Sequence, residues 1–145
     1  MYQSEEKDWK LFRKKLPKWQ EAYMERLIEE YAELLNGDAA ASEKFRALDK
    51  RIRADRQRLG VRVDDVSRSK LQNILTGLII ENIITEDDLQ DFSEELREST
   101  CQWMQIYRRN LEEYTKSRLG EKITPRLFIF RYFPSIMPNA LNSRW

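Results

Sequence analysis

The chain has 145 residues, enough for one domain with a core of its own. Its 26 Lys and Arg against 25 Asp and Glu give a net charge of +1, so no overall field favours nucleic acid or membrane binding. The lack of His excludes His-based catalysis and ordinary zinc sites, and the single Cys101 excludes an intramolecular disulfide. We therefore expect a non-enzymatic protein without metal or cofactor, in a reducing cytoplasm and without a membrane span.

A long amphipathic helix is predicted for residues 4–36. Large apolar residues recur at every third or fourth position from Trp9 to Leu34, which is the rhythm of one helical face. Trp9 and Trp19 are expected at a rim that contacts a partner. The predicted core residues of the stripe are Phe12, Leu16, Leu27 and Leu34. Ser4 is the expected N-cap of this helix and Gly37 its expected left-handed C-cap, and a kink or break is expected at Pro17.

Residues 42–59 are predicted to form a second helix with one apolar and one basic face. Ser42 is its expected cap and Gly60 its end, and the inward residues are Phe45, Leu48, Ile52 and Leu59. The basic residues of the outward face and of the next helix start are Arg46, Lys50, Arg53, Arg68 and Lys70. This basic 44–70 region is either a solvated face with local ion pairs or a contact for phosphate or an acidic partner.

A third helix that starts at Ser67 or Ser69 is predicted to be the most buried element. Thr85 and Asp88 form a capping-box pattern, which predicts the start of a fourth helix that runs to Gly120. An acidic surface around this start includes Asp87, Asp91 and Glu94. Acidic residues in a first helical turn are favoured by the helix dipole, so a magnesium site is not expected here. The acidic surface either keeps the chain in solution or imitates a phosphate backbone.

The last segment differs in character from the rest of the chain. From Pro125 onward it is apolar, aromatic and basic without a helical period, and it includes Arg131 and Trp145. We expect an irregular appendage that covers the helices or inserts into a partner. The predicted fold is all-α, an antiparallel four-helix bundle over residues 1–120 with a tail over 121–145 packed on the bundle or on a partner.

Three stretches resemble a protein family: "WKLFRKKLPKWQEAYMERL", "GVRVDDVSRSK" and "IITEDDLQDFSEELRE". The resemblance covers about residues 5–105, and the family consists of short, uncharacterised helical proteins from gut Firmicutes and their mobile elements. It implies a bacterial, mobile-element setting and brings no catalytic residues. In such settings small proteins without catalytic apparatus often inhibit defence nucleases, as anti-CRISPR proteins do, and this last step is an analogy.

The leading hypothesis is a non-enzymatic helical binding protein that regulates or inhibits a larger macromolecular partner. The expected partner is a protein, with a nucleic-acid-processing complex as one candidate, and no membrane partner is expected. The expected partner-binding residues are Trp9, Trp19, Arg46, Lys50, Arg53, Arg68, Lys70, Asp87, Asp91, Glu94, Arg131 and Trp145. The alternative is a nucleic-acid-binding regulator that uses the basic 44–70 region, and a structural homo-oligomer is a third class. The sequence leaves the oligomeric state open.

Overall fold

The computed structural model describes residues 4–116, 125–133 and 136, and all regular structure in these residues is helical. In chain order the α-helices are α1 (Glu6–Leu35), α2 (Ala41–Asp55), α3 (Leu71–Ile80), α4 (Glu94–Lys116) and α5 (Pro125–Tyr132). Two short 3₁₀ helices, η1 (Arg68–Lys70) and η2 (Glu86–Leu89), precede α3 and α4. The predicted all-α class is confirmed. Within the described residues, no helix is both long enough and apolar enough to cross a membrane.

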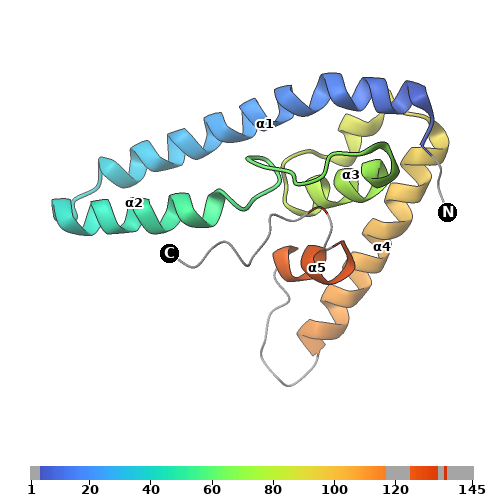
Figure 1. Ribbon diagram of the computed structural model, residues 1–145. Helices are drawn as coiled ribbons and strands as arrows, with labels where there is room; N and C mark the ends of the chain where they lie inside the picture. The colour runs from blue at the N-terminus through green and yellow to red at the C-terminus, as the bar shows by residue number, and fades with distance from the viewer. Residues whose placement is uncertain (1–3, 117–124, 134–135, 137–145) are drawn as a thin grey trace.

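The helices form a body and a projecting arm (Figure 1). The first half of α1 lies over α3 and the start of α4, whereas its second half runs beside α2, away from the other helices. The main helix pairs are α1 with α2 and α3 with α4. The predicted antiparallel four-helix bundle is therefore not confirmed, because α2 lies beyond the reach of α3 and α4.

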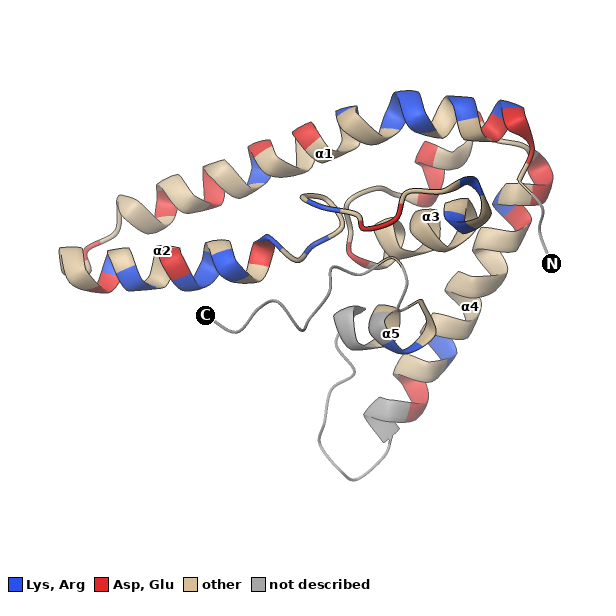
Figure 2. Ribbon diagram, in the orientation of Figure 1, with Lys and Arg blue, Asp and Glu red and all other residues tan. Residues whose placement is uncertain are grey.

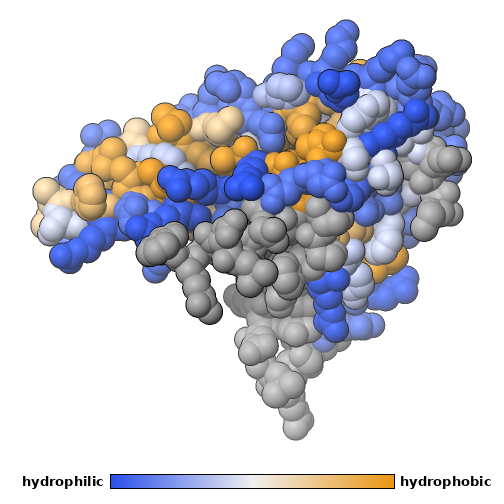
Figure 3. Space-filling view, viewed as in Figure 1, coloured by the Kyte–Doolittle hydropathy of each residue, from blue (hydrophilic) through white to orange (hydrophobic). Residues whose placement is uncertain are grey.

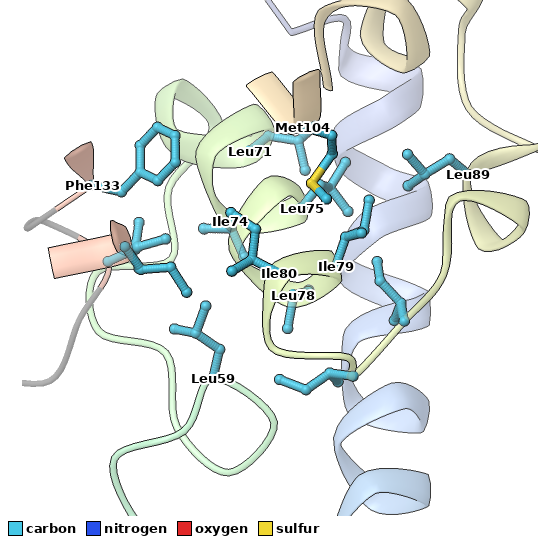
Figure 4. Close-up of a cluster of buried hydrophobic side chains, with 14 of the residues drawn as sticks. Leu59, Leu71, Ile74, Leu75, Leu78, Ile79, Ile80, Leu89, Met104 and Phe133 are labelled. Atoms are coloured by element: carbon cyan, nitrogen blue, oxygen red, sulfur yellow. The ribbon is translucent and has the colours of Figure 1, made fainter. Parts of the chain in front are cut away.

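The core of the body is built around α3, whose residues are apolar except for Gln72, Asn73 and Thr76. Eight of its ten residues are buried, and among them Leu71, Ile74, Leu75 and Leu78 have no exposed surface. Figure 4 shows these side chains meeting Leu59 from the segment after α2, together with residues of α4 and of the segment after α5. A helix with this much apolar surface is stable only when neighbours cover it, and here they cover all of it except the side of Gln72 and Asn73. The prediction that this element is the most buried is confirmed.

A kink or a break was expected at Pro17, and the break does not occur, because α1 passes through Pro17 as one helix. Phe12 and Leu16 just before it are both buried in the core, and their packing offsets the backbone hydrogen bond that proline removes. Pro17 itself is exposed.

Several predicted helix caps are wrong. The residue preceding α1 is Glu5, and the Ser4 hydroxyl donates a hydrogen bond of 2.8 Å to the Arg68 carbonyl instead. Asn36, not a left-handed Gly37, ends α1, and Ala40 precedes α2. α2 ends at Asp55, well before Gly60. At the start of α1, the contact with Arg68 uses the Ser4 hydroxyl that was expected to cap the helix.

The capping box of Thr85 and Asp88 is confirmed, but it starts η2 rather than the fourth helix. The Asp88 carboxylate accepts a 2.8 Å hydrogen bond from the Thr85 N–H. α4 begins at Glu94, where the preceding Ser93 is held by Asp8 of α1. The buried Asp8 carboxylate accepts bonds of 2.9 Å from the Ser93 N–H and 2.6 Å from its hydroxyl, which ties the start of α1 to the start of α4.

The tail was expected to be irregular, and for residues 125–132 this is wrong, because they form α5. Proline is well suited to the first position of a helix, and Phe128 and Ile129 one turn later are buried in the core. The Phe128 ring meets Tyr107 of α4 edge-on, with ring centroids 4.7 Å apart. Phe133 and Ile136 are also buried, so these parts of the tail cover the body. Trp145 lies outside the described residues.

Candidate interaction surface

The most distinctive surface of the molecule is the hairpin arm, which we define as residues 21–55. It comprises the second half of α1, the connecting loop and α2, and it projects from the body (Figure 1). A layer of only two helices has open faces on both sides. Apolar residues on it, such as Leu34, Leu48 and Ile52, are therefore only half-buried.

Polar contacts around the buried carboxylate of Asp55 keep the two helices of the arm together. The Tyr31 hydroxyl donates a 2.6 Å hydrogen bond to the Asp55 carboxylate, and the Arg51 Nε donates one of 3.0 Å to the same oxygen. Arg51 also pairs with Glu30 of α1. Desolvation, together with the hydrogen bond and the charge of Asp55, raises the pKa of Tyr31 to about 12. The hydrogen bond to Glu30 raises the pKa of Arg51 above its ordinary value. Both groups therefore hold their protons firmly, and the network locks the arm.

Three large apolar side chains stand out from this arm. Ile28 is 63% exposed, Leu35 45% and Phe45 74%. Phe45 was predicted to point inward, and this is wrong because its side of α2 faces no described element. Ile28 and Leu35 are seven residues apart and so share one stripe of α1, about a quarter-turn from the side that meets α2. Phe45 stands at a similar angle on the antiparallel helix α2, and this places all three on the same face of the hairpin. Figure 3 shows hydrophobic side chains gathered over the arm.

Charges of opposite sign line the two edges of the arm (Figure 2). The α1 edge carries Glu21, Glu25, Glu29 and Glu33, all exposed. On α2 the basic residues Arg46, Lys50 and Arg53 are exposed, as predicted for an outward face. Arg53 pairs with Asp49 at 3.1 Å, whereas no ion pair within the described residues involves Arg46 or Lys50.

The basic 44–70 region is not one surface. Arg68 and Lys70 lie in η1 beside the start of α3, while the basic face of α2 lies in the arm (Figure 2). The Arg68 Nε donates a 2.8 Å hydrogen bond to the Ser4 carbonyl, and Lys70 pairs with Asp65. Local contacts therefore occupy both side chains. The structure does not bring these two residues together with those on α2.

Trp9 and Trp19 pack against the core with half-buried rings. Trp9 stacks on Phe12 with centroids 5.8 Å apart, and Trp19 tilts toward Phe92 at 6.4 Å. The ammonium of Lys15 lies 5.9 Å from the centre of the Trp19 ring. Each tryptophan can thus offer a partner only part of its ring.

The acidic residues are dispersed around the starts of η2 and α4. Asp91 pairs with Lys15 at 2.9 Å, and Asp87 and Glu94 are exposed on η2 and at the first position of α4. Arg131 is exposed on α5, far along the chain from this cluster. Within the described residues, no group of three or more Cys, Asp or Glu side chains could hold a metal ion.

A shallow hollow of about 560 Å³ lies between α3, η2 and α4, and it was not predicted from the sequence. Ile79, Ile80 and Met104 supply apolar lining, and an ion pair of 2.6 Å between Glu86 and Arg108 stands at its edge. Thr85 also lines this hollow, and its hydroxyl donates a 3.2 Å hydrogen bond to the Asp88 carboxylate as part of the capping box of η2.

Sequence reasoning also missed the exposed apolar residues of the arm. The available signal was the spacing of Ile28 and Leu35, which lie seven residues apart and outside the main apolar stripe of α1.

Comparison with protein families, with curated proteins and with solved structures finds no match to this chain. The assignment of a function therefore depends on the surfaces described above.

Proposed function

We propose that this chain is a non-enzymatic helical binding protein that regulates or inhibits a larger macromolecular partner, which it contacts through the hairpin arm. The observation that carries this proposal is the exposure of Ile28, Leu35 and Phe45 on a projecting arm whose two helices are locked together. Exposed apolar clusters rimmed by charge are typical of protein-binding surfaces.

The size of the apolar contribution indicates the kind of interface. Full burial of a wholly exposed side chain of this kind contributes roughly 1.5–3 kcal/mol. Ile28, Leu35 and Phe45 are 63%, 45% and 74% exposed, so covering all three contributes roughly 3–5 kcal/mol. Association itself costs an estimated 4–15 kcal/mol. The three side chains therefore act as anchors, and the partner must also match the charged edges of the arm. In the mobile-element setting that the sequence resemblance implies, the proposed partner is a bacterial nucleic-acid-processing defence complex, which an anti-CRISPR-like protein would inhibit.

The test is a capture experiment with a matched pair of variants. Phe45→Ser removes the most exposed anchor, and Val66→Ser removes an apolar side chain that is 42% exposed outside the arm. We expect the wild type and Val66→Ser to retain the same protein from a lysate of the source cell, and Phe45→Ser to lose it. The activity of the captured complex should fall when wild-type chain is added. Equal capture by both variants would contradict the use of the arm, and turnover of a substrate by the purified chain would contradict a non-enzymatic role.

A basic stripe on α1 favours the second candidate, a nucleic-acid-binding regulator. Lys7, Lys10, Lys14 and Lys18 follow steps of three and four residues along the first half of α1, and all are exposed. Figure 2 shows Lys and Arg residues along this part of α1. This stripe replaces the divided 44–70 region as the surface for phosphate contacts. Four such contacts predict that the logarithm of the DNA affinity falls with the logarithm of salt concentration with a slope of about −3.6. Fluorescence anisotropy with labelled DNA and RNA measures this slope, and no binding at low salt would exclude the candidate.

A further inference from the structure

We propose that, when no other partner is bound, a second copy of this chain covers the apolar face of the hairpin arm, giving a symmetric dimer. This inference rests on the proposed function only because both use the hairpin arm as the binding surface. The partner here is a second copy of the chain, whose arm is complementary in charge. An apolar face with Phe45 74% exposed on a projecting element favours association in water.

The charges of the arm are self-complementary. Residues 21–35 of α1 carry five Glu and one Arg, a net charge of −4, from one minus five. α2 carries five Lys and Arg against three Asp and Glu, a net charge of +2, from five minus three. One edge of the apolar face is therefore acidic and the other basic. A surface that presents both signs side by side is complementary to a rotated copy of itself.

This segregation also selects the symmetry axis. A two-fold axis along the length of the arm places α1 of one copy opposite α2 of the other, so that glutamates meet lysines and arginines. An in-plane axis across the arm would place α1 opposite α1 and bring glutamates together, which is unfavourable. With the axis along the arm, every neighbouring pair of helices is antiparallel. The two arms then form an antiparallel four-helix bundle shared between the copies.

The dimensions of the arm set the strength of this dimer. The 15 residues of α2 span about 22 Å at 1.5 Å per residue, and two helices side by side are about 20 Å wide. The footprint is roughly 450 Å² per copy, or about 900 Å² in total, which is below the range of stable specific interfaces and is typical of weak, transient ones. We therefore expect a dissociation constant in the micromolar range. A partner that binds the same face more tightly can displace the second copy from a dimer of this strength.

The first experiment measures mass against concentration by sedimentation equilibrium of the full chain. The expected mass rises from 17.5 kDa toward twice that value, 35.0 kDa, as the concentration passes from about 1 to 200 μM. Phe45→Ser should raise the dissociation constant at least about tenfold, and Val66→Ser should leave it unchanged. A chain that stays monomeric throughout would overturn the dimer but leave the capture experiment of the proposed function untouched, so the two can fail separately.

Charge reversal provides the sharper experiment. The acid-reversed variant is Glu25→Lys with Glu29→Lys, and the base-reversed variant is Arg46→Glu with Lys50→Glu. In each variant alone, α1 of one copy and α2 of the other carry like charges at both contacts of the dimer, so each variant should be monomeric. Circular dichroism checks that each variant keeps its helix content. An equal mixture of the two should dimerise, because both contacts then join opposite charges. Dimerisation of either variant alone, or failure of the mixture, would overturn the proposed pairing.

The position of the arm tips tests the symmetry axis. Asp38 lies in the loop at the tip, and Cys101→Ser removes the native thiol. With the axis along the arm, the tips of the two copies are neighbours, and a short bifunctional maleimide should join Asp38→Cys of one copy to that of the other. With the axis across the arm, the tips would lie about 22 Å or more apart and would not be joined. The absence of cross-linked dimer at a concentration where sedimentation shows dimer would overturn the axis.

Discussion

Asp55→Ala should loosen the hairpin arm without disturbing the body. The carboxylate is buried and accepts two hydrogen bonds, from Tyr31 at 2.6 Å and from Arg51 at 3.0 Å. A hydrogen bond to a charged group contributes roughly 1.5–3 kcal/mol, so the two together contribute roughly 3–6 kcal/mol. Tyr31 and Arg51 can both turn to water, and Arg51 keeps Glu30, so we expect the lower end, about 3 kcal/mol.

Amide hydrogen exchange measures this effect segment by segment. A loss of about 3 kcal/mol corresponds to roughly hundredfold faster exchange, and it should be confined to residues 21–55. Asp49→Ala is the matched control, because it removes an aspartate–arginine pair on the same helix with the same four-residue spacing. Both side chains of that pair are about half exposed, so its removal should change the exchange free energy by less than about 0.5 kcal/mol. Equal acceleration in the two variants would refute the reasoning that burial of Asp55 makes its bonds strong.

Three further predictions concern the body and the effect of pH. Asp8→Ala removes both hydrogen bonds to Ser93, so the free energy of unfolding measured by urea denaturation should fall by about 3 kcal/mol; a loss below about 1 kcal/mol would contradict the role of this contact. Gly60→Ala places a methyl group inside the ring of Tyr23, so the same measurement should show a loss of about 1–3 kcal/mol, and an unchanged midpoint would show that the ring moves freely. The pKa of Tyr31 is raised to about 12 in the folded chain, so its proton contributes stability that is complete below pH 10 and is lost as the pH rises through 12. The stability difference between wild type and Tyr31→Phe should therefore shrink between pH 10 and pH 12, and a constant difference would contradict the shift.

The sequence predicted best those features that depend on local pattern. The apolar stripe of α1 correctly placed Phe12, Leu16 and Leu27 in the core, and the continuous apolar run of α3 correctly marked it as the central element. The capping box at Thr85 was also correct in its hydrogen bonds. Each of these depends on residues within a few positions of one another, which sequence spacing reveals directly.

The wrong predictions depend on what surrounds an element. Phe45 fits the apolar stripe of α2, but the pattern cannot reveal that no third helix lies against it. The start of α4 at Glu94 depends on Asp8, which lies 85 residues away from Ser93 in the chain. α5 lacks a long apolar period, and its helix is supported by contacts of Phe128 with α4. Periodicity identifies the apolar face of a helix. Whether that face is buried depends on the tertiary structure.

The long helix α1 has a mechanical property. Its 30 residues span about 45 Å, and its first part is fixed in the body through Phe12 and Leu16 before Pro17 and through Trp19 and Tyr23 after it. The backbone hydrogen bond that proline cannot make is therefore missing within the anchored part of the helix, where packing on both sides holds the backbone in place. From Tyr23 to Leu35 the helix extends about 18 Å, so a bend of about 5° where α1 leaves the body displaces the tip by about 1.6 Å. α1 therefore acts as a lever whose fulcrum lies near Tyr23, and a load applied at the tip acts in the body as a torque on the side chains that anchor it.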